Sequence, residues 1–475
     1  MATSKTITKN TKKKTAKRTT KKTRGKNPTI ESFSAAVNYL SNQTDFERMR
    51  IVQYDETLFK LDRMKTLLKA IGNPQEKVAM IHVAGTVGKG STVAMICSML
   101  QGNGYTVGAY TSPHLTDIRE RVVVNEEMVD ENTFTELLRH VVQAATKHDL
   151  TPTFFELITA VAFKHFADEA VDIAVIETGL GGRLDSTNVI TPLMTLITKI
   201  DLDHVNILGT TVEEIAREKA GIFKSSIPAI SAHQSESVTT VLRECAESTG
   251  TEVRVIAQDI EFSSRFGGGI DGKQHTRICI ITEHSQYMHI PVPLDGEHQA
   301  TNCALALAAI DQLKEVGYTF NDLDIYHSLA KTTISGRMEV VWERPKILVD
   351  GAHNPTSLKT LIKSVGAHIP YDSMVCVFGC CQDKDVDGML EQISLGADKI
   401  IFTKAKGNPR AAEPRLLQKQ FEEISGKMTQ TAETLPEALE IAAQAASRED
   451  LICVTGSFYL VGETKSHLSQ LASKK

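Results

Sequence analysis

The 475-residue sequence has no long hydrophobic run and few of the residue types that mark specialised protein classes. No stretch approaches the roughly 18 consecutive apolar residues of a membrane span, and the N-terminus lacks the apolar core of a secretory signal. Its 30 Gly and 14 Pro are too few for a collagen-like or low-complexity chain. The eight Cys lack the paired spacing of a zinc site, so we interpret them as reduced thiols. We expect a globular cytoplasmic protein with no membrane partner.

Acidic residues are absent from residues 1–30, which carry eleven Lys and Arg. The formal charge of -5 for the whole chain therefore leaves -16 for the remainder. This segment has no apolar periodicity and cannot bury enough surface to offset its ordering entropy, so we predict a disordered basic tail over residues 1–29. Nucleic acid or another polyanion is the alternative partner, but the tail has no aromatic residue for stacking on bases. We favour a solvated tail.

Apolar runs of strand length alternate with helical patterns from residue 30 onward, which predicts an α/β fold with mostly parallel sheets. Ligands of such sheets collect at the carboxyl ends of the strands, so residues directly after each strand are the first candidates for a site. The predicted strands are Val78–Ala84, Tyr105–Thr111, Asp172–Glu177, Leu193–Ile200, Lys346–Asp350, Met374–Gly379, Lys399–Lys404 and Leu451–Thr455.

A change of pattern near residues 331–336 predicts two domains. Helical stretches over Ala300–Glu315 and Leu323–Ala330 give way there to a polar segment and a new series of strands. We therefore predict a first domain over 30–333 and a smaller one over 334–475. Alternating residues within Ser263–His289 predict a β excursion inside the first domain.

The strongest local motif is a Gly-rich turn between a strand and an apolar helix. It contains Gly85, Thr86, Gly88, Lys89, Gly90 and Ser91. Glycines let backbone N–H groups approach an anion, the helix N-terminus adds a favourable dipole, and Lys89 supplies a positive charge for β- and γ-phosphates. Because Val83 replaces the first Gly of the P-loop pattern and Gly90 displaces its hydroxyl, a purely structural turn is the alternative to nucleotide binding.

Three further polar residues follow predicted strands. Ser112, Glu177 and His204 offer a hydroxyl, a carboxylate and an imidazole, and Mg²⁺ beside a nucleotide prefers oxygen ligands. Taken singly, Ser112 could cap a turn, Glu177 could pair with Arg183, and His204 could be a core histidine.

Lys219 lies on the apolar face of a predicted helix that starts with a capping box at Thr211. Burial lowers the pKa of a lysine, and an uncharged amine can add CO₂ to become a carbamate with two oxygens suited to Mg²⁺. The alternative is a lysine that extends to solvent.

In the predicted second domain, Asp350 ends a strand and could accept hydrogen bonds from a ribose, while Arg337 could hold a phosphate. Asn302 and Ser457 occupy turn-like or strand-end positions of the same kind. From the residues alone, each is equally well explained as a turn or cap residue.

Seven ordered motifs between Ser32 and Glu463 resemble the folylpolyglutamate synthase/dihydrofolate synthase family, a group of Mur-ligase-like amino-acid ligases. The Gly-rich turn alone would be shared with ligases of cell-wall synthesis. The motifs are His82–Ser91, Thr111–Leu115, Phe154–Glu156, Glu177–Asn188, Asp203–His204, Glu218–Ile222 and Asp350–Pro355.

This resemblance implies a P-loop domain followed by a smaller Rossmann-like domain, and an ADP-forming ligase that joins L-glutamate to dihydropteroate or a reduced folate. It implies ATP and Mg²⁺ as cofactors, with a carbamate on Lys219, and we expect a monomer. The family roles fall on Gly85, Thr86, Gly88, Lys89, Gly90, Ser91, Asn302, Arg337 and Asp350 for ATP; on Ser112, Glu177, His204 and Lys219 for the metal; on Thr153, Phe154, Phe155, Glu156, Leu184, Asp185 and Ser457 for substrates; and on Lys89, Lys219 and His353 for catalysis.

One departure from the family pattern is Val87, which stands where Asn is usual. Two alternatives stay open at this point. One is a Mur-type ligase with a different carboxylate substrate, and the other is an inactive protein that uses the basic tail to bind a polyanion. The motifs at Phe154–Glu156 and Leu180–Asp185 argue against the first, and the retained metal positions argue against the second.

Overall fold

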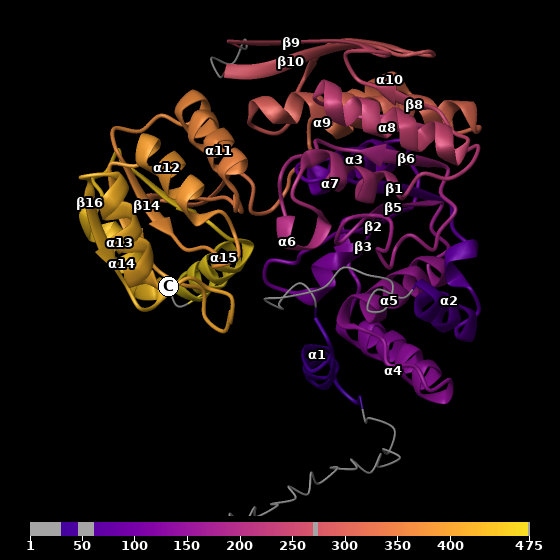
Figure 1. Cartoon of the computed structure of the whole chain (residues 1–475), viewed down its shortest axis with the longest axis horizontal. Helices are drawn as coiled ribbons and strands as arrows, with labels where there is room; N and C mark the ends of the chain where they lie inside the picture. The colour runs from indigo at the N-terminus through magenta and orange to yellow at the C-terminus, as the bar shows by residue number, and fades with distance from the viewer. Residues whose placement is uncertain (1–29, 46–60, 269–273, 474–475) are drawn as a thin grey trace, which may run out of the picture.

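The structure is a computed structural model that describes residues 30–45, 61–268 and 274–473. It has two α/β lobes, with the larger one formed by the earlier part of the chain and the smaller one by the C-terminal part (Figure 1). The predicted two-domain fold is therefore confirmed. The predicted tail over 1–29 lies outside the described residues, and the exact boundary at 333/334 stays a prediction.

The larger lobe is built on an eight-stranded sheet of order β4-β3-β2-β5-β1-β6-β7-β8. Its strands are parallel except for β3 and β4, which add an antiparallel edge. The four strands predicted in this lobe form its centre, where both faces are buried and the sequence is mostly apolar, with His82 in β1 and Glu177 at the end of β5 as exceptions. The bounds are β1 Met80–Ala84, β2 Val107–Tyr110, β3 Val122–Val124, β4 Glu127–Met128, β5 Ile173–Glu177, β6 Met194–Ile197, β7 Ala229–Ser231 and β8 Val253–Val255.

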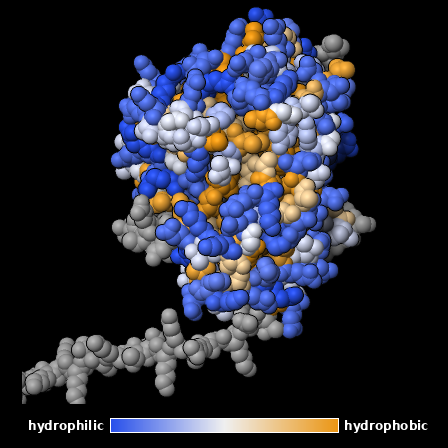
Figure 2. Space-filling view, turned by 90° about the vertical axis from the view of Figure 1, so that its right-hand side faces the viewer, coloured by the Kyte–Doolittle hydropathy of each residue, from blue (hydrophilic) through white to orange (hydrophobic). Residues whose placement is uncertain are grey.

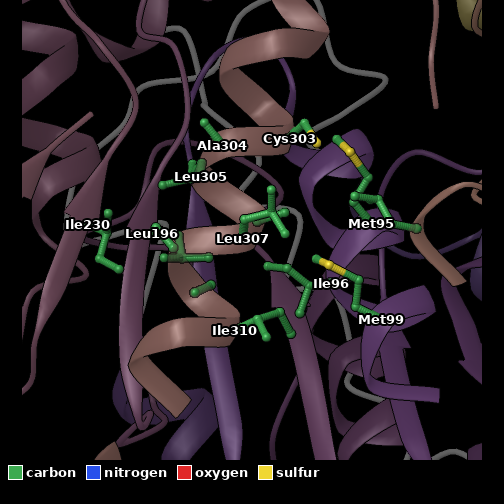
Figure 3. Close-up of a cluster of buried hydrophobic side chains, with 14 of the residues drawn as sticks. Met95, Ile96, Met99, Leu196, Ile230, Cys303, Ala304, Leu305, Leu307 and Ile310 are labelled. Carbon is green, nitrogen blue, oxygen red and sulfur yellow. The ribbon is translucent and has the colours of Figure 1, made fainter. Parts of the chain in front are cut away.

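Helices cover both faces of this sheet. On one face α3 and α9 lie side by side, and Met95 and Met99 of α3 and Leu307 of α9 belong to the same buried cluster as Leu196 of β6 and Ile230 of β7 (Figure 3). The bounds are α1 Phe33–Ser41, α2 Leu61–Ala70, α3 Lys89–Gly102, α4 Glu131–Lys147, α5 Phe154–Asp168, α6 Val205–Leu208, α7 Val212–Ala220, α8 Glu236–Thr249, α9 Glu297–Glu315 and α10 Asp322–Leu329, with 3₁₀ turns at Pro74–Glu76 and Ile118–Arg121.

The predicted β excursion is confirmed as a separate antiparallel sheet of order β11-β10-β9, formed by β9 (Glu261–Gly268), β10 (Gln274–Ile281) and β11 (Gln286–Pro291). Ile278, Ile280 and Tyr287 pack this sheet onto α9. It lies at the top of Figure 1, away from the ends of the strands that lead into the predicted site.

The smaller lobe has a six-stranded sheet of order β12-β13-β17-β14-β15-β16, parallel apart from β12. All four strands predicted here are confirmed and form its centre, covered by helices on both faces. The bounds are β12 Glu339–Glu343, β13 Lys346–Val349, α11 Pro355–His368, β14 Met374–Phe378, α12 Val386–Gly396, β15 Lys399–Phe402, α13 Pro414–Ile424, β16 Met428–Thr431, α14 Leu435–Ala445, β17 Leu451–Thr455 and α15 Phe458–Ala472.

The lobes touch where α15 packs on the loop after β2. A Cβ on Gly462 would lie 2.0 Å from the carbonyl oxygen of Leu115, so only glycine allows this approach. A second contact joins β9 to α11, where the rings of Phe266 and His368 meet edge to face at 5.3 Å. These two contacts join the lobes, with the carboxyl ends of the sheet strands lying between them.

The surface on the right-hand side of Figure 1 is mostly hydrophilic, with hydrophobic residues gathered toward its middle (Figure 2). In the part of the chain that the structure describes, none of the helices has the length and apolar character needed to cross a membrane. All eight cysteines are free thiols, which confirms the prediction that they are reduced.

We expect Gly462→Ala to lower the free energy of unfolding, because the added methyl group collides with the backbone of Leu115. In an exposed helix the same change usually stabilises by about 0.5–1 kcal/mol. Gly366→Ala in α11, where a Cβ meets nothing within 4 Å, is the matched control and should stabilise. Urea unfolding of both variants measures the difference, and equal shifts of the same sign would contradict the close interlobe contact.

Candidate active site

The Gly-rich turn joins β1 to α3. Gly88 caps α3 with φ at +95°, and a Cβ there would lie 2.3 Å from Asn302 Oδ1. A Cβ on Gly85 would lie 1.8 Å from Thr198 Oγ1. Both glycines are therefore required by close packing as well as by backbone conformation. The turn directs the N-terminus of α3, which begins at Lys89, toward the space between the lobes.

Two backbone N–H groups of this turn are already bonded within the protein. Those of Thr86 and Val87 donate to the carbonyl oxygen of Lys199 at 2.9 and 3.1 Å. The groups that remain to meet an anion are those of the first turn of α3, which have no partner within the helix. The helix dipole favours negative charge at the same place. An anion here would therefore be bound by the N-terminus of α3 and not by a loop whose backbone N–H groups surround it.

Two lysine side chains converge on one backbone oxygen beside this helix. Lys219 Nζ lies 2.7 Å and Lys89 Nζ 3.2 Å from the carbonyl oxygen of Gly85. Lys219 is 5% exposed, so the alternative of a lysine extending to solvent is wrong. Burial, with the charge of Lys89 in addition, lowers the pKa of Lys219 to about 7. A substantial fraction of Lys219 is therefore uncharged near neutral pH.

Glu177 ends β5 and faces the same lysines. Its Oε1 lies 3.7 Å from Lys89 Nζ, and its Oε2 accepts a 3.4 Å hydrogen bond from the backbone N–H of Ser112. Burial raises the pKa of Glu177, and the charge of Lys89 opposes that rise. The alternative pairing with Arg183 is wrong, since Arg183 instead binds Glu218 at 3.0 Å.

His204 and Asp203 follow β6 and reach residues of the smaller lobe. Asp203 Oδ1 lies 2.5 Å from Lys384 Nζ, and its Oδ2 lies 3.6 Å from His353 Nε2 and 3.8 Å from His204 Nε2. Burial by itself would raise the pKa of Asp203, but the imidazoles of His204 and His353 and the charge of Lys384 outweigh it and hold that pKa well below its usual range. Asp203 therefore stays ionised as a bridge between the lobes.

The donor chemistry around Glu177 suits a divalent cation. Partial burial lowers the pKa of His204, whose side chain is 35% exposed, and this favours an uncharged imidazole that can offer a lone pair. Glu177 contributes a buried carboxylate and Ser112 a hydroxyl. This combination of oxygen ligands with one imidazole fits Mg²⁺ next to phosphates.

The predicted pterin-binding residues form a second part of the site. Thr153 caps α5 through a capping box with Glu156, whose carboxylate also binds Arg63 Nε at 2.8 Å. The ring of Phe155 packs against Gly179, where a Cβ would lie 2.5 Å from it. Phe154 turns the other way and stacks beneath the guanidinium of Arg121 at 5.3 Å.

The smaller lobe contributes residues from the ends of β13 and β17. Arg337 stacks on the ring of Phe458 at 4.6 Å. The carboxylate of Asp350 accepts hydrogen bonds from the backbone N–H groups of Met338 and Ala352, and burial raises its pKa. Ser457 caps α15 by accepting from the N–H of Leu460.

A cavity of about 1230 Å³ between the lobes unites most of these residues. Phe154, Asn302 and Asp350 do not line it, although Asn302 is linked to the cavity wall because it donates to Gln299, which donates to Ser91. The predicted residues that line the cavity are Gly85, Thr86, Gly88, Lys89, Gly90, Ser91, Ser112, Thr153, Phe155, Glu156, Glu177, Leu184, Asp185, His204, Lys219, Arg337, His353 and Ser457.

Our sequence analysis missed charged residues from the smaller lobe. Lys384 and the ion pair of Asp383 with Arg410 line the cavity, and Asp203 was noted only as a neighbour of His204. Asp383 and Lys384 come shortly after β14, and Arg410 follows β15. The rule that ligands lie at strand ends would have found all three.

Comparison with known proteins identifies two family models along the chain. Residues 83–310 match the Mur ligase middle domain, and residues 336–458 match the glutamate ligase domain of Mur ligases. The dihydrofolate synthase/folylpolyglutamate synthase of Bacillus subtilis is 36% identical over 416 residues, covering 86% of this chain and 94% of that protein. The folylpolyglutamate synthase of Lacticaseibacillus casei is 32% identical and covers 86% and 94%.

Solved structures show the same similarity. Mycobacterium tuberculosis folylpolyglutamate synthase complexed with ADP has a TM-score of 0.82 at 30% identity, covering 92% of this chain and 98% of that one. Escherichia coli FolC in complex with DHPP and ADP has a TM-score of 0.81 at 27% identity, covering 94% and 100%. The similarity thus extends across both lobes.

The lowered pKa of Lys219 makes stability depend on pH. Between pH 7 and 10.5 the unfolded chain binds more protons at this lysine than the folded one does, so the wild-type free energy of unfolding gains up to about 1.4 kcal/mol per pH unit. Lys219→Met lacks this gain. In metal-free, CO₂-free buffer, the stability of Lys219→Met minus that of the wild type should therefore fall from pH 7 to 9. Lys65→Met, at a lysine 61% exposed, is the control, and a pH-independent difference for Lys219→Met would contradict the buried site.

Proposed function

The chain belongs to the dihydrofolate synthase/folylpolyglutamate synthase family of Mur ligases, and on that premise we propose that its interlobe cavity is the ligase active site. It is an ADP-forming enzyme that uses ATP and Mg²⁺ to join L-glutamate to a folate-type acid. The acid is dihydropteroate, the γ-carboxylate of a reduced folate, or both.

The observation that carries the assignment of the site is the convergence of Lys89 and Lys219 on Gly85 beside the N-terminus of α3. Two amines beside the N-terminus of a helix favour a polyanion such as a triphosphate, and Glu177 lies 3.7 Å from Lys89 at the same place. Lys89 then neutralises charge on the γ-phosphate. The other parts of the nucleotide would be bound with the help of Asn302, Arg337 and Asp350.

Ser112, Glu177 and His204 would hold Mg²⁺, with a carbamate on Lys219 as a further ligand. Bound there, the cation would screen the charge of the transferring phosphoryl group. The uncharged fraction of Lys219 is the form that adds CO₂, so the pKa of about 7 supports the carbamate.

The reaction proceeds in two steps. The carboxylate of the acid attacks the γ-phosphate to give an acyl phosphate and ADP, and the amine of glutamate then displaces phosphate through a tetrahedral intermediate. His353 Nδ1 donates to the carbonyl oxygen of Gly351 at 2.8 Å, which leaves Nε2 to accept a proton from the incoming amine, with Asp203 beside it. Enclosure between the lobes keeps water from hydrolysing the acyl phosphate.

The pterin-containing acid would be bound by Thr153, Phe155, Glu156, Leu184 and Asp185. The glutamate would be bound by Ser457. Phe154 would act from behind this wall, because its ring faces Arg121. A Mur-type ligase with another carboxylate is not favoured by the named relatives. We further propose that the enzyme acts as a monomer and that the basic tail plays no part in turnover.

We expect ADP release that depends on L-glutamate together with dihydropteroate or tetrahydrofolate, measured in Mg²⁺ with a coupled assay. Glu177→Gln should lower kcat/KM by about 100-fold or more, because it removes charge from the metal site. Arg183→Gln, which removes the ion pair of Arg183 with Glu218 and leaves Glu177 in place, is the control. Absence of substrate-dependent ADP release in both mixtures would refute the ligase assignment.

Lys219→Ala should abolish turnover, and added bicarbonate or a short carboxylate should partly restore it if a carbamate normally supplies the missing oxygens. Mass spectrometry of the wild-type enzyme trapped in bicarbonate should show the mass of one CO₂ on the peptide that contains Lys219. An active enzyme in bicarbonate whose Lys219 is unmodified would contradict the carbamate.

A further inference from the structure

We propose that His82 is a positioning residue for recognition of the heteroaromatic ring of the acid substrate. His82 holds the hydroxyl of Thr187, which in turn holds the carboxylate of Asp185. That carboxylate then fixes the turn at Gly179 and Leu180. The inference rests on the proposed function, because Gly179, Leu180 and Asp185 line the cavity beside Phe155. His82 and Thr187 lie behind this wall and do not line the cavity.

A continuous chain of hydrogen bonds joins these residues. His82 Nε2 lies 2.8 Å from Thr187 Oγ1, which lies 2.5 Å from Asp185 Oδ1. Asp185 Oδ1 also accepts from the backbone N–H of Thr187 at 3.0 Å. Its Oδ2 accepts from the N–H groups of Gly179 and Leu180 at 3.0 and 2.8 Å. His82 and Thr187 are fully buried, and Asp185 is 4% exposed.

Burial raises the pKa of the Asp185 carboxyl, and the hydrogen bonds that it accepts oppose this rise and favour its ionised form. Three of the four partners of Asp185 are backbone N–H groups, which can only donate, so Asp185 is an acceptor and the hydroxyl of Thr187 donates to it. The oxygen of Thr187 is then free to accept, and His82 must carry its proton on Nε2. Burial, with the charge of Lys224 in addition, lowers the pKa of His82 to about 3, so the imidazole stays uncharged.

The other ring nitrogen shows that His82 is not there for stability alone. Among the described residues, His82 Nδ1 has no hydrogen-bond partner although it is buried. An unsatisfied buried polar atom costs roughly 1–3 kcal/mol. An apolar residue in the middle of β1, whose other residues are Met80, Ile81, Val83 and Ala84, would avoid this cost. The imidazole therefore offers the Nε2 donor at the expense of folding stability.

The four donors fill the acceptor positions of the Asp185 carboxylate. Its main effect is thus to hold the turn at Gly179 and Leu180, against which the ring of Phe155 packs. A substrate N–H group that binds the Asp185 carboxylate must share an oxygen with donors that are already bound there. Loss of the His82 donor should let this wall shift, which would weaken binding of a flat ring much more than binding of ATP at the N-terminus of α3.

The test compares His82→Leu with His82→Gln, whose amide nitrogen can replace Nε2 as a donor. His82→Leu should raise KM for the pterin-containing acid about tenfold, the value of one charge-linked hydrogen bond, with kcat and the KM of ATP within about twofold. His82→Gln should restore KM. Thr195→Val is the matched control, because Thr195 is paired with His82 in the sheet and its buried hydroxyl has no partner.

A double-mutant cycle separates positioning from a general structural role. Thr187→Val should raise the same KM, and combining it with His82→Leu should add little, because both changes interrupt one chain. Thermal unfolding of His82→Leu should show no loss of stability. An unchanged KM for the pterin-containing acid in His82→Leu would overturn the inference. Equal rises in the KM values of the acid, ATP and glutamate, together with a lowered melting temperature, would overturn it as well. A wild-type enzyme with no pterin-dependent ADP release would overturn the proposed function as well.

Discussion

Two lysines that share the carbonyl oxygen of Gly85 are the constraint on which the site depends. Charged amines repel each other in a buried setting. Glu177 lies 3.7 Å from Lys89, and the carboxylates of Asp203 and Asp185 also offset the charge of Lys219. The arrangement is tolerable when Lys219 loses its proton or when an anion joins the group. Both outcomes serve a ligase that binds a triphosphate. The glycines at 85 and 88 make this geometry accessible, because any side chain there would collide with Thr198 or Asn302.

The second constraint is the bridge between the lobes. Asp203 comes from the larger lobe and meets Lys384 and His353 from the smaller one, at the point where the carboxyl ends of both sheets face each other. A cluster of this kind forms only when the lobes approach, so it helps to hold the smaller lobe against the larger one. Close packing of Gly462 on Leu115 keeps the distance between α15 and the loop after β2 small.

The wall that faces the acid substrate shows a different principle. Its shape is set by a buried carboxylate rather than by apolar packing alone, since Asp185 organises backbone N–H groups of one turn and the hydroxyl of Thr187. His82 completes this network from within a strand of otherwise apolar residues. Polar networks of this kind specify a single arrangement when every donor has an acceptor.

The sequence by itself determined the central strands of both sheets, the capping box at Thr211 and the motifs that mark the family, because apolar periodicity and local hydrogen bonds are properties of neighbouring residues. It also pointed to Glu177, His204 and Lys219 through their places after strands or on a helix face. Only the tertiary structure decided that Glu177 meets Lys89 rather than Arg183, that Phe154 turns away from the cavity, and that Lys384 and Arg410 join it. Those pairings depend on how distant segments approach in space, and no local pattern encodes that distance.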